Sequence, residues 1–420
     1  MNNSPFVDFS LLKSNRYFRT VFIARTLSLI GLGMLAVALP MQVYELTGDS
    51  FQVGLVMACD GLGLFVGLLY GGVLADRYDR KKLILLARGI CGLGYLGLAL
   101  NALLPEPSLT AIYLLSLWDG LFGALGVTAL LACMPHIVGR EKLMQARAIS
   151  MVSMRLATVI TPAVGGVIIA NAGVHWNYLI AAFGTGLTLL PLLSLPAMKP
   201  PVLAVRNPLL ELLDGLNFVL HNKVVGSVVA IGTLVTFTTA IRVLFPALVD
   251  ESFGGGAFEL GLMYSAVPLG ACLGALISAW ANHLRQPGQV MMLVCMAVFV
   301  CITLLGLTPN LWLALPILVL FGYLVSIASL LQYTLVQGHT PDIYLGRING
   351  LWTAQDACGD SLGTFGIGVL GKFLPALGSI FTLGAGSLLV GLSLLGICKT
   401  VRNAPLNNPE LMTDSTAAAD

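Results

Sequence analysis

Residues 72–82 read Gly-Val-Leu-Ala-Asp-Arg-Tyr-Asp-Arg-Lys-Lys and join two long apolar stretches, residues 51–74 and 82–103. Each stretch is longer than the roughly 20 residues with which a helix crosses the apolar core of a bilayer. A short basic loop between two such stretches is typical of the cytoplasmic side of a membrane protein. This part of the sequence therefore predicts two membrane-spanning helices joined by a cytoplasmic loop.

The same pattern recurs on both sides of this segment. Apolar residues make up 57% of the 420 residues and charged residues only 10%, and the mean hydropathy is +0.89. This composition excludes a soluble enzyme, because such a chain needs lipid as its solvent. We expect an all-α polytopic membrane protein with twelve transmembrane helices, although the short joint at 308–310 also permits eleven. The expected spans are 20–45, 51–74, 82–103, 109–133, 146–171, 176–197, 224–249, 258–282, 288–307, 311–336, 348–371 and 376–398.

Lys and Arg residues gather in alternate loops. The loops between them contain acidic residues, and Lys372 is their single basic residue. The positive-inside rule makes the basic set cytoplasmic, so both termini are expected in the cytoplasm and the number of spans is even, which favours twelve. The basic loops lie near residues 13–19, 77–82, 140–147, 199–223, 285, 347 and 399–402.

Residues 198–223 divide the chain. They are rich in proline and charge and contain a short amphipathic run, so we expect a cytoplasmic linker with a surface helix. It separates two six-helix bundles, 1–197 and 224–399, and the second is followed by a disordered cytoplasmic tail, 400–420. Arg147 and Arg347 begin the fifth and eleventh spans at an offset of 200 residues, a weak internal repeat of the kind found in transporters.

The loop at 72–82 resembles the G-x-L-x-D-R-x-G-R-[RK] signature of the major facilitator superfamily. Small Gly72 suits a tight turn, and Asp76 can accept hydrogen bonds from a helix N-terminus. The basic side chains can pair with acids or lipid phosphates, forming a latch that opens and closes during transport. Asp79 stands where the signature has glycine, and the simpler alternative is a basic loop without a gating role. The basic members are Arg77, Arg80 and Lys81.

Residues 157–166, in the fifth span, resemble the g-x-x-x-G-P-x-x-G-G motif of proton-coupled antiporters in the same superfamily. Pro162 leaves a backbone carbonyl unpaired, and Gly165 and Gly166 let another helix approach closely. The segment can therefore bend and seal one side of a cavity, which favours export over uptake. Thr161 replaces the central glycine of the motif, and plain helix packing is the alternative.

Several further segments resemble the bacterial enterobactin exporters, and the likeness runs from about residue 11 to residue 399. This resemblance alone implies a major facilitator fold and the export of a catecholate siderophore from the cytoplasm to the periplasm across the inner membrane. The motif at 157–166 favours protons as the coupling ion, and outer-membrane export machinery is a further expected partner. The segments are 74–77, 85–89, 101–109, 117–120 and 345–355.

Seven charged residues lie deep in expected spans, where each costs roughly 2.5–3.5 kcal/mol on insertion scales and usually lines a pathway or pairs. Asp356 and Asp360 are four residues apart and share a helical face, where mutual repulsion favours keeping a proton on the pair. Asp119 and Arg155 lie at similar depth and are expected to form an ion pair. Asp360 and Asp119 are the first choices for proton coupling, and fixed structural pairing is the alternative. The cluster comprises Asp60, Asp119, Asp356, Asp360, Arg25, Arg155 and Arg242.

Trp118 and Trp352 lie beside these charges. Each could stack on a catechol ring or anchor its helix at the lipid interface.

Motifs for other functions are weak. Residues 92–97 and 366–371 match G-x-G-x-x-G but lie inside apolar spans, and the five histidines are scattered. We therefore expect no enzyme activity, no cofactor, no metal site and no nucleic-acid partner. A broad-specificity drug/H⁺ antiporter and a non-transporting membrane receptor remain the alternatives to a siderophore exporter.

Overall fold

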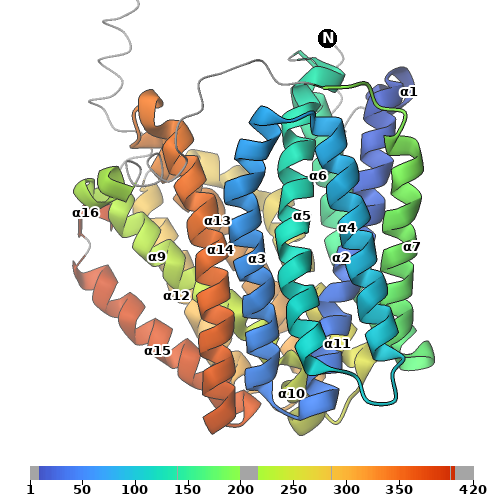
Figure 1. Ribbon diagram of the computed structural model, residues 1–420. Coiled ribbons are helices and arrows are strands. Elements are labelled where there is room, and N and C mark those ends of the chain that lie inside the picture. Colours follow the sequence, from blue (N-terminus) through green and yellow to red (C-terminus); the bar gives the residue numbers. More distant parts are fainter. Residues whose placement is uncertain (1–8, 140, 199–215, 285, 398, 403–420) are drawn as a thin grey trace, which may run out of the picture. The chain divides into compact units, whose positions relative to one another are not determined.

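The computed structural model describes residues 9–139, 141–198, 216–284, 286–397 and 399–402, and every regular element in these ranges is a helix (Figure 1). The helices form two compact units. The first is built from residues up to 205 together with 255–265, and the second from 206–254 and from 266 onward. The two six-helix bundles expected from the sequence stay a prediction.

The first unit contains α1 and the long helices α2 to α7, in chain order. Their bounds are α1 Ser10–Ser14, α2 Arg16–Thr47, α3 Ser50–Arg77, α4 Arg80–Ala102, α5 Leu109–Val138, α6 Leu143–Ala172 and α7 Val174–Leu192. The beginning of α11, Ala257–Ile277, also belongs to this unit.

In the second unit, helical residues 216–221 precede a broken helix. After α9, Lys223–Thr239, the chain passes through the 3₁₀ turn η1, Ala240–Leu244, then α10, Phe245–Leu248, and the π-turn η2, Val249–Phe253. The remaining elements are the rest of α11, η3 Ser278–His283, α12 Pro287–Leu305, α13 Leu311–Gly338, α14 Asp342–Phe373, α15 Ala376–Ile397 and α16 Lys399–Arg402. The expected surface helix at 209–214 and residues 403–420 of the expected tail lie outside the described residues.

Ten helical segments in the described part of the chain are long and apolar enough to cross a membrane. The spans expected at 176–197 and 348–371 coincide with α7 and α14, which are helical but are not among the ten. Asp356 and Asp360 lower the hydropathy of α14. The protein is thus an all-helical, multi-pass membrane protein, while the count of twelve spans stays a prediction.

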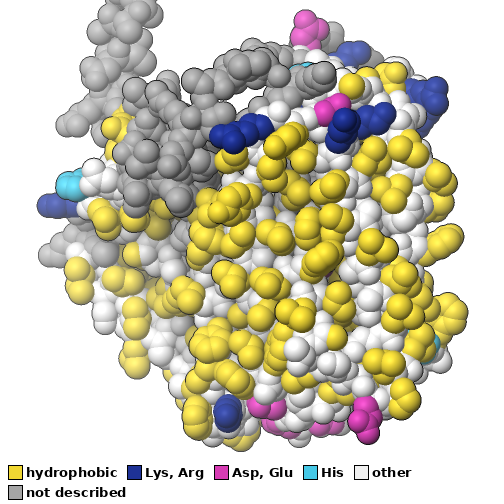
Figure 2. All heavy atoms as spheres, viewed as in Figure 1, with side chains coloured by type: hydrophobic (Ala, Val, Ile, Leu, Met, Phe, Trp, Pro, Cys, Tyr) yellow, Lys and Arg dark blue, Asp and Glu magenta, His cyan; other side chains and the backbone are white. Residues whose placement is uncertain are grey.

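The surface suits lipid. Large apolar side chains such as Leu93, Leu114 and Phe183 are exposed, which would be unfavourable in water over so wide an area. On the face shown in Figure 2 they form a broad band, with dark-blue Lys and Arg mostly along one margin and magenta Asp and Glu mostly along the other.

Glycines bring α3 and α5 into backbone contact in the first unit. A Cβ atom added at Gly67 would lie 2.7 Å from Cβ of Ala124, and one added at Gly120 would lie 2.7 Å from the backbone nitrogen of Leu64. Gly63 and Gly71 meet α5 in the same way. Association of membrane helices relies on such close packing, because lipid supplies no hydrophobic drive between them.

The second unit repeats this arrangement with α11 and α13. A Cβ atom at Gly270 would lie 2.8 Å from the backbone nitrogen of Tyr323, and one at Gly322 would lie 2.9 Å from the carbonyl carbon of Val267. Gly63 and Gly67 correspond to Gly270 and Gly274 at one offset, since 270 − 63 and 274 − 67 both equal 207. The same device therefore fixes a helix pair in each unit.

Candidate functional site

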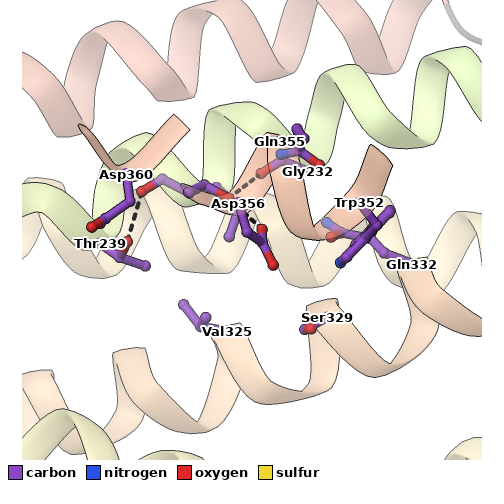
Figure 3. Close-up of a pocket in the computed structure, with 11 residues that line it drawn as sticks. Gly232, Thr239, Val325, Ser329, Gln332, Trp352, Gln355, Asp356 and Asp360 are labelled. Carbon is purple, nitrogen blue, oxygen red and sulfur yellow. Dashed lines mark hydrogen bonds between the residues drawn. The ribbon is translucent and has the colours of Figure 1, made fainter. Parts of the chain in front are cut away.

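A cavity of about 270 Å³ lies within the second unit, between α9, α13 and α14 (Figure 3). Its wall combines apolar, hydroxyl, carboxamide and carboxylate side chains, as in small-molecule sites, where a few polar groups orient the ligand. The lining residues are Gly232, Val235, Thr236, Thr239, Val325, Ser329, Gln332, Trp352, Gln355, Asp356 and Asp360.

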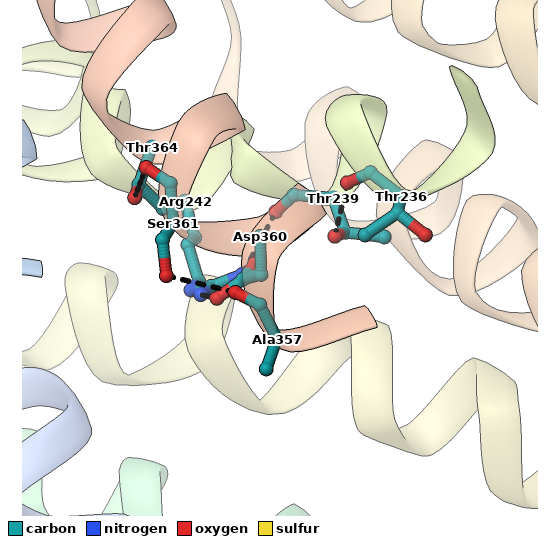
Figure 4. A network of polar contacts seen from close by, with 7 residues as sticks. All are labelled: Thr236, Thr239, Arg242, Ala357, Asp360, Ser361 and Thr364. Carbon is teal, nitrogen blue, oxygen red and sulfur yellow. Dashed lines mark hydrogen bonds and ion pairs between the residues drawn. The ribbon is translucent and has the colours of Figure 1, made fainter. Parts of the chain in front are cut away.

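The two acids of α14 have different surroundings. Asp360 accepts a 2.5 Å hydrogen bond from Nη2 of Arg242 in an ion pair, and Nη1 of Arg242 donates to the carbonyl of Thr239 at 3.3 Å (Figure 4). Asp356 accepts a long 3.5 Å bond from the hydroxyl of Thr236, and the described residues give it no cationic partner. One carboxylate of the cavity is therefore neutralised, and the other faces it without a counter-charge.

The 3₁₀ turn η1 brings Arg242 to Asp360. Pro246 follows at the start of α10 and has no amide hydrogen to donate. Around it the chain changes from the α-helix α9 to the short elements η1, α10 and η2. A broken membrane helix beside a charged cavity is a feature that transporters use at their binding sites.

Trp352 and two carboxamides form the other end of the cavity (Figure 3). Gln332 is buried and donates to the sulfur of Cys295 at 3.6 Å. Both amide atoms of Gln355 are buried and have no hydrogen-bond partner. A Cβ atom at Gly232 would lie 3.1 Å from Oε1 of Gln332 and 3.7 Å from the ring of Trp352, so glycine keeps this part of the cavity open.

In the first unit, Asp119 is not paired with Arg155 as the sequence predicted. Arg88 of α4 is the cation that acts on Asp119, and the hydroxyl of Tyr95 hydrogen-bonds its carboxylate. The Nε atom of Arg155 is buried without a partner. The sequence indicates that Asp119 and Arg155 lie at a similar depth in the membrane. It does not indicate how each helix is rotated about its axis, which determines the side chains that come into contact.

The other predicted residues of the first unit lie around this group. Arg25 is close enough to Arg88 for the two cations to repel each other. The backbone of Asp60 packs against Gly120, next to Asp119 in the chain. Trp118 donates from Nε1 to the carbonyl of Ile90 at 3.1 Å, which ties α5 to α4.

Arg80 of the loop motif is buried. It donates to the carbonyls of Ala75 at 3.2 Å and Ala132 at 3.0 Å, and it also contacts His136. Arg80 therefore links α3 to α5 through one backbone carbonyl of each helix.

The departure at Asp79 has a structural reason. Asp79 is the N-cap of α4, accepting from the amide of Lys81 at 3.0 Å and from that of Met198 at 3.0 Å. Its φ of −60° requires no glycine. Gly72 lies inside α3 with nothing within 4 Å of an added Cβ, so the expected steric need for glycine there is absent. Arg77 is exposed, Lys81 is half-buried, and the side chain of Asp76 lies outside the description.

In the motif of α6, Gly166 packs against the beginning of α11. A Cβ atom added there would lie 2.9 Å from Cα of Gly261, and one at Gly261 would lie 2.7 Å from the carbonyl of Pro162. Buried Asn177 of α7 donates to the carbonyls of Gly165 at 3.2 Å and Met34 at 3.4 Å. Their role in gating stays a prediction.

Residues missed from the sequence include Gln355, Gln332, Arg88 and Asn177. A search for charges passes over the neutral amides, although any carboxamide in an apolar span is a usable signal. The described residues contain no group of three or more His, Cys, Asp or Glu side chains arranged to hold a metal ion.

The sequence matches the family described as transmembrane secretion effectors, of the major facilitator superfamily, over residues 7–411. The enterobactin exporters EntS of Escherichia coli O1:K1 and of Shigella boydii serotype 18 are each 50% identical over 405 residues, covering 96% of this chain and 97% of the relative.

Two solved structures share the fold at low sequence identity. The nucleoside transporter NupG aligns with a TM-score of 0.74 at 14% identity, covering 91% of this chain and 99% of its own. A peptide transporter POT in complex with sulfate aligns with a TM-score of 0.68 at 15% identity, covering 92% and 95%. Since the family match spans nearly the whole sequence, this chain belongs to the transmembrane secretion effector family of the major facilitator superfamily.

Proposed function

We propose that this protein is a secondary exporter that moves an enterobactin-like catecholate siderophore from the cytoplasm to the periplasm across a bacterial inner membrane. The observation that carries the proposal is the 50% identity to enterobactin exporters over 96% of the chain. The cavity of the second unit supports it, because Trp352 offers an aromatic face and the exposed residues Ser329 and Asp356 offer polar groups to a hydroxylated ring.

The proposed architecture is twelve spans in two six-helix halves, 1–197 and 224–399, with the linker and both termini in the cytoplasm. The glycine crossings of α3 with α5 and of α11 with α13 support a repeat, since they use equivalent positions. The positive-inside pattern supports the orientation.

The proposed mechanism is proton antiport by alternating access. Asp360 would exchange Arg242 for a proton during the cycle, and Asp356 would sense the substrate or share that proton. Asp119, with Tyr95 and Arg88, is the corresponding candidate in the first unit. The loop at 72–82 and the motif at 162–166 would gate the two sides. Outer-membrane machinery would carry the siderophore onward.

Siderophore release from an iron-starved bacterium tests the proposal. We expect deletion of the gene to lower intact siderophore in the medium and to raise material retained inside, and the wild-type gene to restore export. An unchanged medium together with greater sensitivity to unrelated amphipathic compounds would replace the proposal with a drug/H⁺ antiporter. Binding without movement in proteoliposomes would indicate a receptor.

Everted membrane vesicles test proton coupling separately. Uptake of labelled siderophore should follow an imposed pH gradient and collapse when a protonophore dissipates it. Uptake that ignores the gradient would remove protons from the mechanism while leaving export intact.

A further inference from the structure

Asp356 is the one acid of the second-unit cavity wall that has no counter-charge among the described residues. Its side chain is exposed, lines the cavity and makes no ion pair there. The other acid of the wall, Asp360, is paired with Nη2 of Arg242 at 2.5 Å. When both acids are ionised, two carboxylates and one guanidinium leave one negative charge uncompensated. Charges within a membrane protein are usually paired, so this wall favours a ligand that brings a positive charge.

An aromatic ring lies one helical turn from this carboxylate. Trp352 precedes Asp356 by four residues on α14, and side chains at this spacing are neighbours on one face of a helix. Both residues line the cavity (Figure 3). The face of a tryptophan ring attracts a cation that lies within about 6 Å of its centre, and quaternary ammonium ions are recognised in this way. The wall therefore offers an ion pair and a cation–π contact to the same ligand.

We propose that this cavity binds a small organic ammonium ion, whose charged nitrogen lies between the carboxylate of Asp356 and the ring of Trp352. This ligand class differs from the catecholate siderophore of the proposed function, and the inference does not depend on that function. Ser329 is an exposed residue of α13 that lines the same cavity. Its hydroxyl can bond a polar group on the rest of the ligand.

The size of the cavity suits a compact ligand. The volume of about 270 Å³ lies just below the roughly 300–1,000 Å³ of sites for drug-sized molecules. Val235 and Val325 add apolar surface to the wall. This surface can cover the methyl and methylene groups that surround an alkylammonium nitrogen, so an ammonium ion with a few carbon atoms matches both the space and the lining.

A bare metal ion matches this wall less well. Calcium and magnesium ions require about six or more oxygen ligands. The hydroxyl of Thr236 lies 3.5 Å from a carboxylate oxygen of Asp356, and no three His, Cys, Asp or Glu side chains of the described residues are grouped to hold a metal. The ring of Trp352 contributes no oxygen at all. A single carboxylate beside an aromatic face is better matched to an organic cation.

Choline and its neutral isostere, in which a tert-butyl group replaces the trimethylammonium group, test the inference. The two probes have the same shape and differ in charge. Calorimetric titration of the full-length protein in lipid nanodiscs measures both affinities. We expect wild type to bind choline at least about tenfold more tightly than the isostere, because only choline makes the ion pair and the cation–π contact.

The variants identify the two contacts. Asp356→Asn should weaken choline binding about tenfold or more and leave binding of the isostere unchanged. Asp356→Glu keeps the charge and should retain part of the preference for choline. Trp352→Leu should weaken choline binding about three- to tenfold through the lost cation–π contact. Asp250→Asn makes the same chemical change at an exposed position of η2 outside the cavity, so this matched control should bind as wild type.

Each outcome decides the inference. Equal affinities of wild type for choline and its isostere, or a preference that survives in Asp356→Asn, overturn it. If Asp356→Asn does not elute as wild type in gel filtration, the other two variants carry the test. A preference reduced in Trp352→Leu and retained in Asp356→Glu then supports the inference, and the reverse pattern overturns it. Siderophore export from iron-starved cells is measured separately, so failure of either proposal is seen without the other.

Discussion

The ion pair between Arg242 and Asp360 is the interaction whose strength can be most directly worked out. Coulomb's law with an effective dielectric of about 20 gives roughly 4 kcal/mol for unit charges about 4 Å apart, whereas exposed pairs contribute about 1 kcal/mol or less. The two side chains are 28% and 32% exposed. We therefore expect a coupling free energy of about 2 kcal/mol, between these limits.

A double-mutant cycle measures this coupling. Arg242→Gln and Asp360→Asn should each lower the free energy of unfolding, because each leaves one charge unpaired, and the double variant should lose less than their sum by about 2 kcal/mol. Denaturant titration of the purified protein in mixed micelles supplies the values. Asp356→Asn combined with Arg242→Gln is the matched control, since that acid makes no ion pair with Arg242 in the described structure.

A coupling below about 0.5 kcal/mol would refute the electrostatic reasoning. Export by the same variants then separates structure from mechanism. If the double variant recovers export, the pair only stabilises the fold. If the double variant is more stable than the single variants but still does not export in response to the proton gradient, Asp360 carries the proton.

Three further outcomes follow from packing and hydrogen bonds, each measured as thermal stability and export rate. Gly67→Leu should lower the stability by at least about 3 kcal/mol, because its Cβ would collide with Ala124 and with the backbone of α5. Gly72→Ala should leave the stability unchanged or slightly raise it, because the space around Gly72 is open. Equal losses of stability in the two variants would contradict the close packing of α3 on α5. Arg80→Lys should cost about 2 kcal/mol, since one ammonium cannot replace the two guanidinium nitrogens that donate to the carbonyls of Ala75 and Ala132. Wild-type stability of this variant would contradict the expectation. Trp118→Phe should cost about 1 kcal/mol through the lost bond to Ile90, and a change confined to substrate affinity would instead favour a stacking role.

The sequence was most informative where length and hydropathy decide the structure. The long apolar stretches of the sequence are long helices in the structure. A helix is required there because a backbone surrounded by lipid must form all its hydrogen bonds within itself. The seventh expected span, 224–249, lies within the helical segment Lys223–Phe253, which is long and apolar enough to cross a membrane. The sequence did not predict that the turns η1 and η2 interrupt its α-helix, because Asp360, the partner of Arg242 in η1, lies far away in the sequence on α14.

The candidate site was less predictable. The spacing of Asp356 and Asp360 placed both on one face of α14, yet only the fold determines that Arg242 reaches Asp360 and leaves Asp356 alone. Asp119 met Arg88 instead of Arg155, because hydropathy defines depth in the membrane and says little about the rotation of a helix. Gln355 carries no charge, so a search for intramembrane charges passes over it, and its lack of hydrogen-bond partners is seen only in the folded structure.

The glycine crossings also determine how the specificity of this protein can evolve. Gly322 fixes α13 against α11, and Val325, Ser329 and Gln332, on the following turns, line the cavity. At the crossing the two backbones touch, so any residue larger than glycine pushes the helices apart. Few substitutions are therefore tolerated there. The cavity residues of the same helix are free to change one at a time on a scaffold that stays constant. A change of substrate then needs only new side chains along α13, without a change at the glycine crossing.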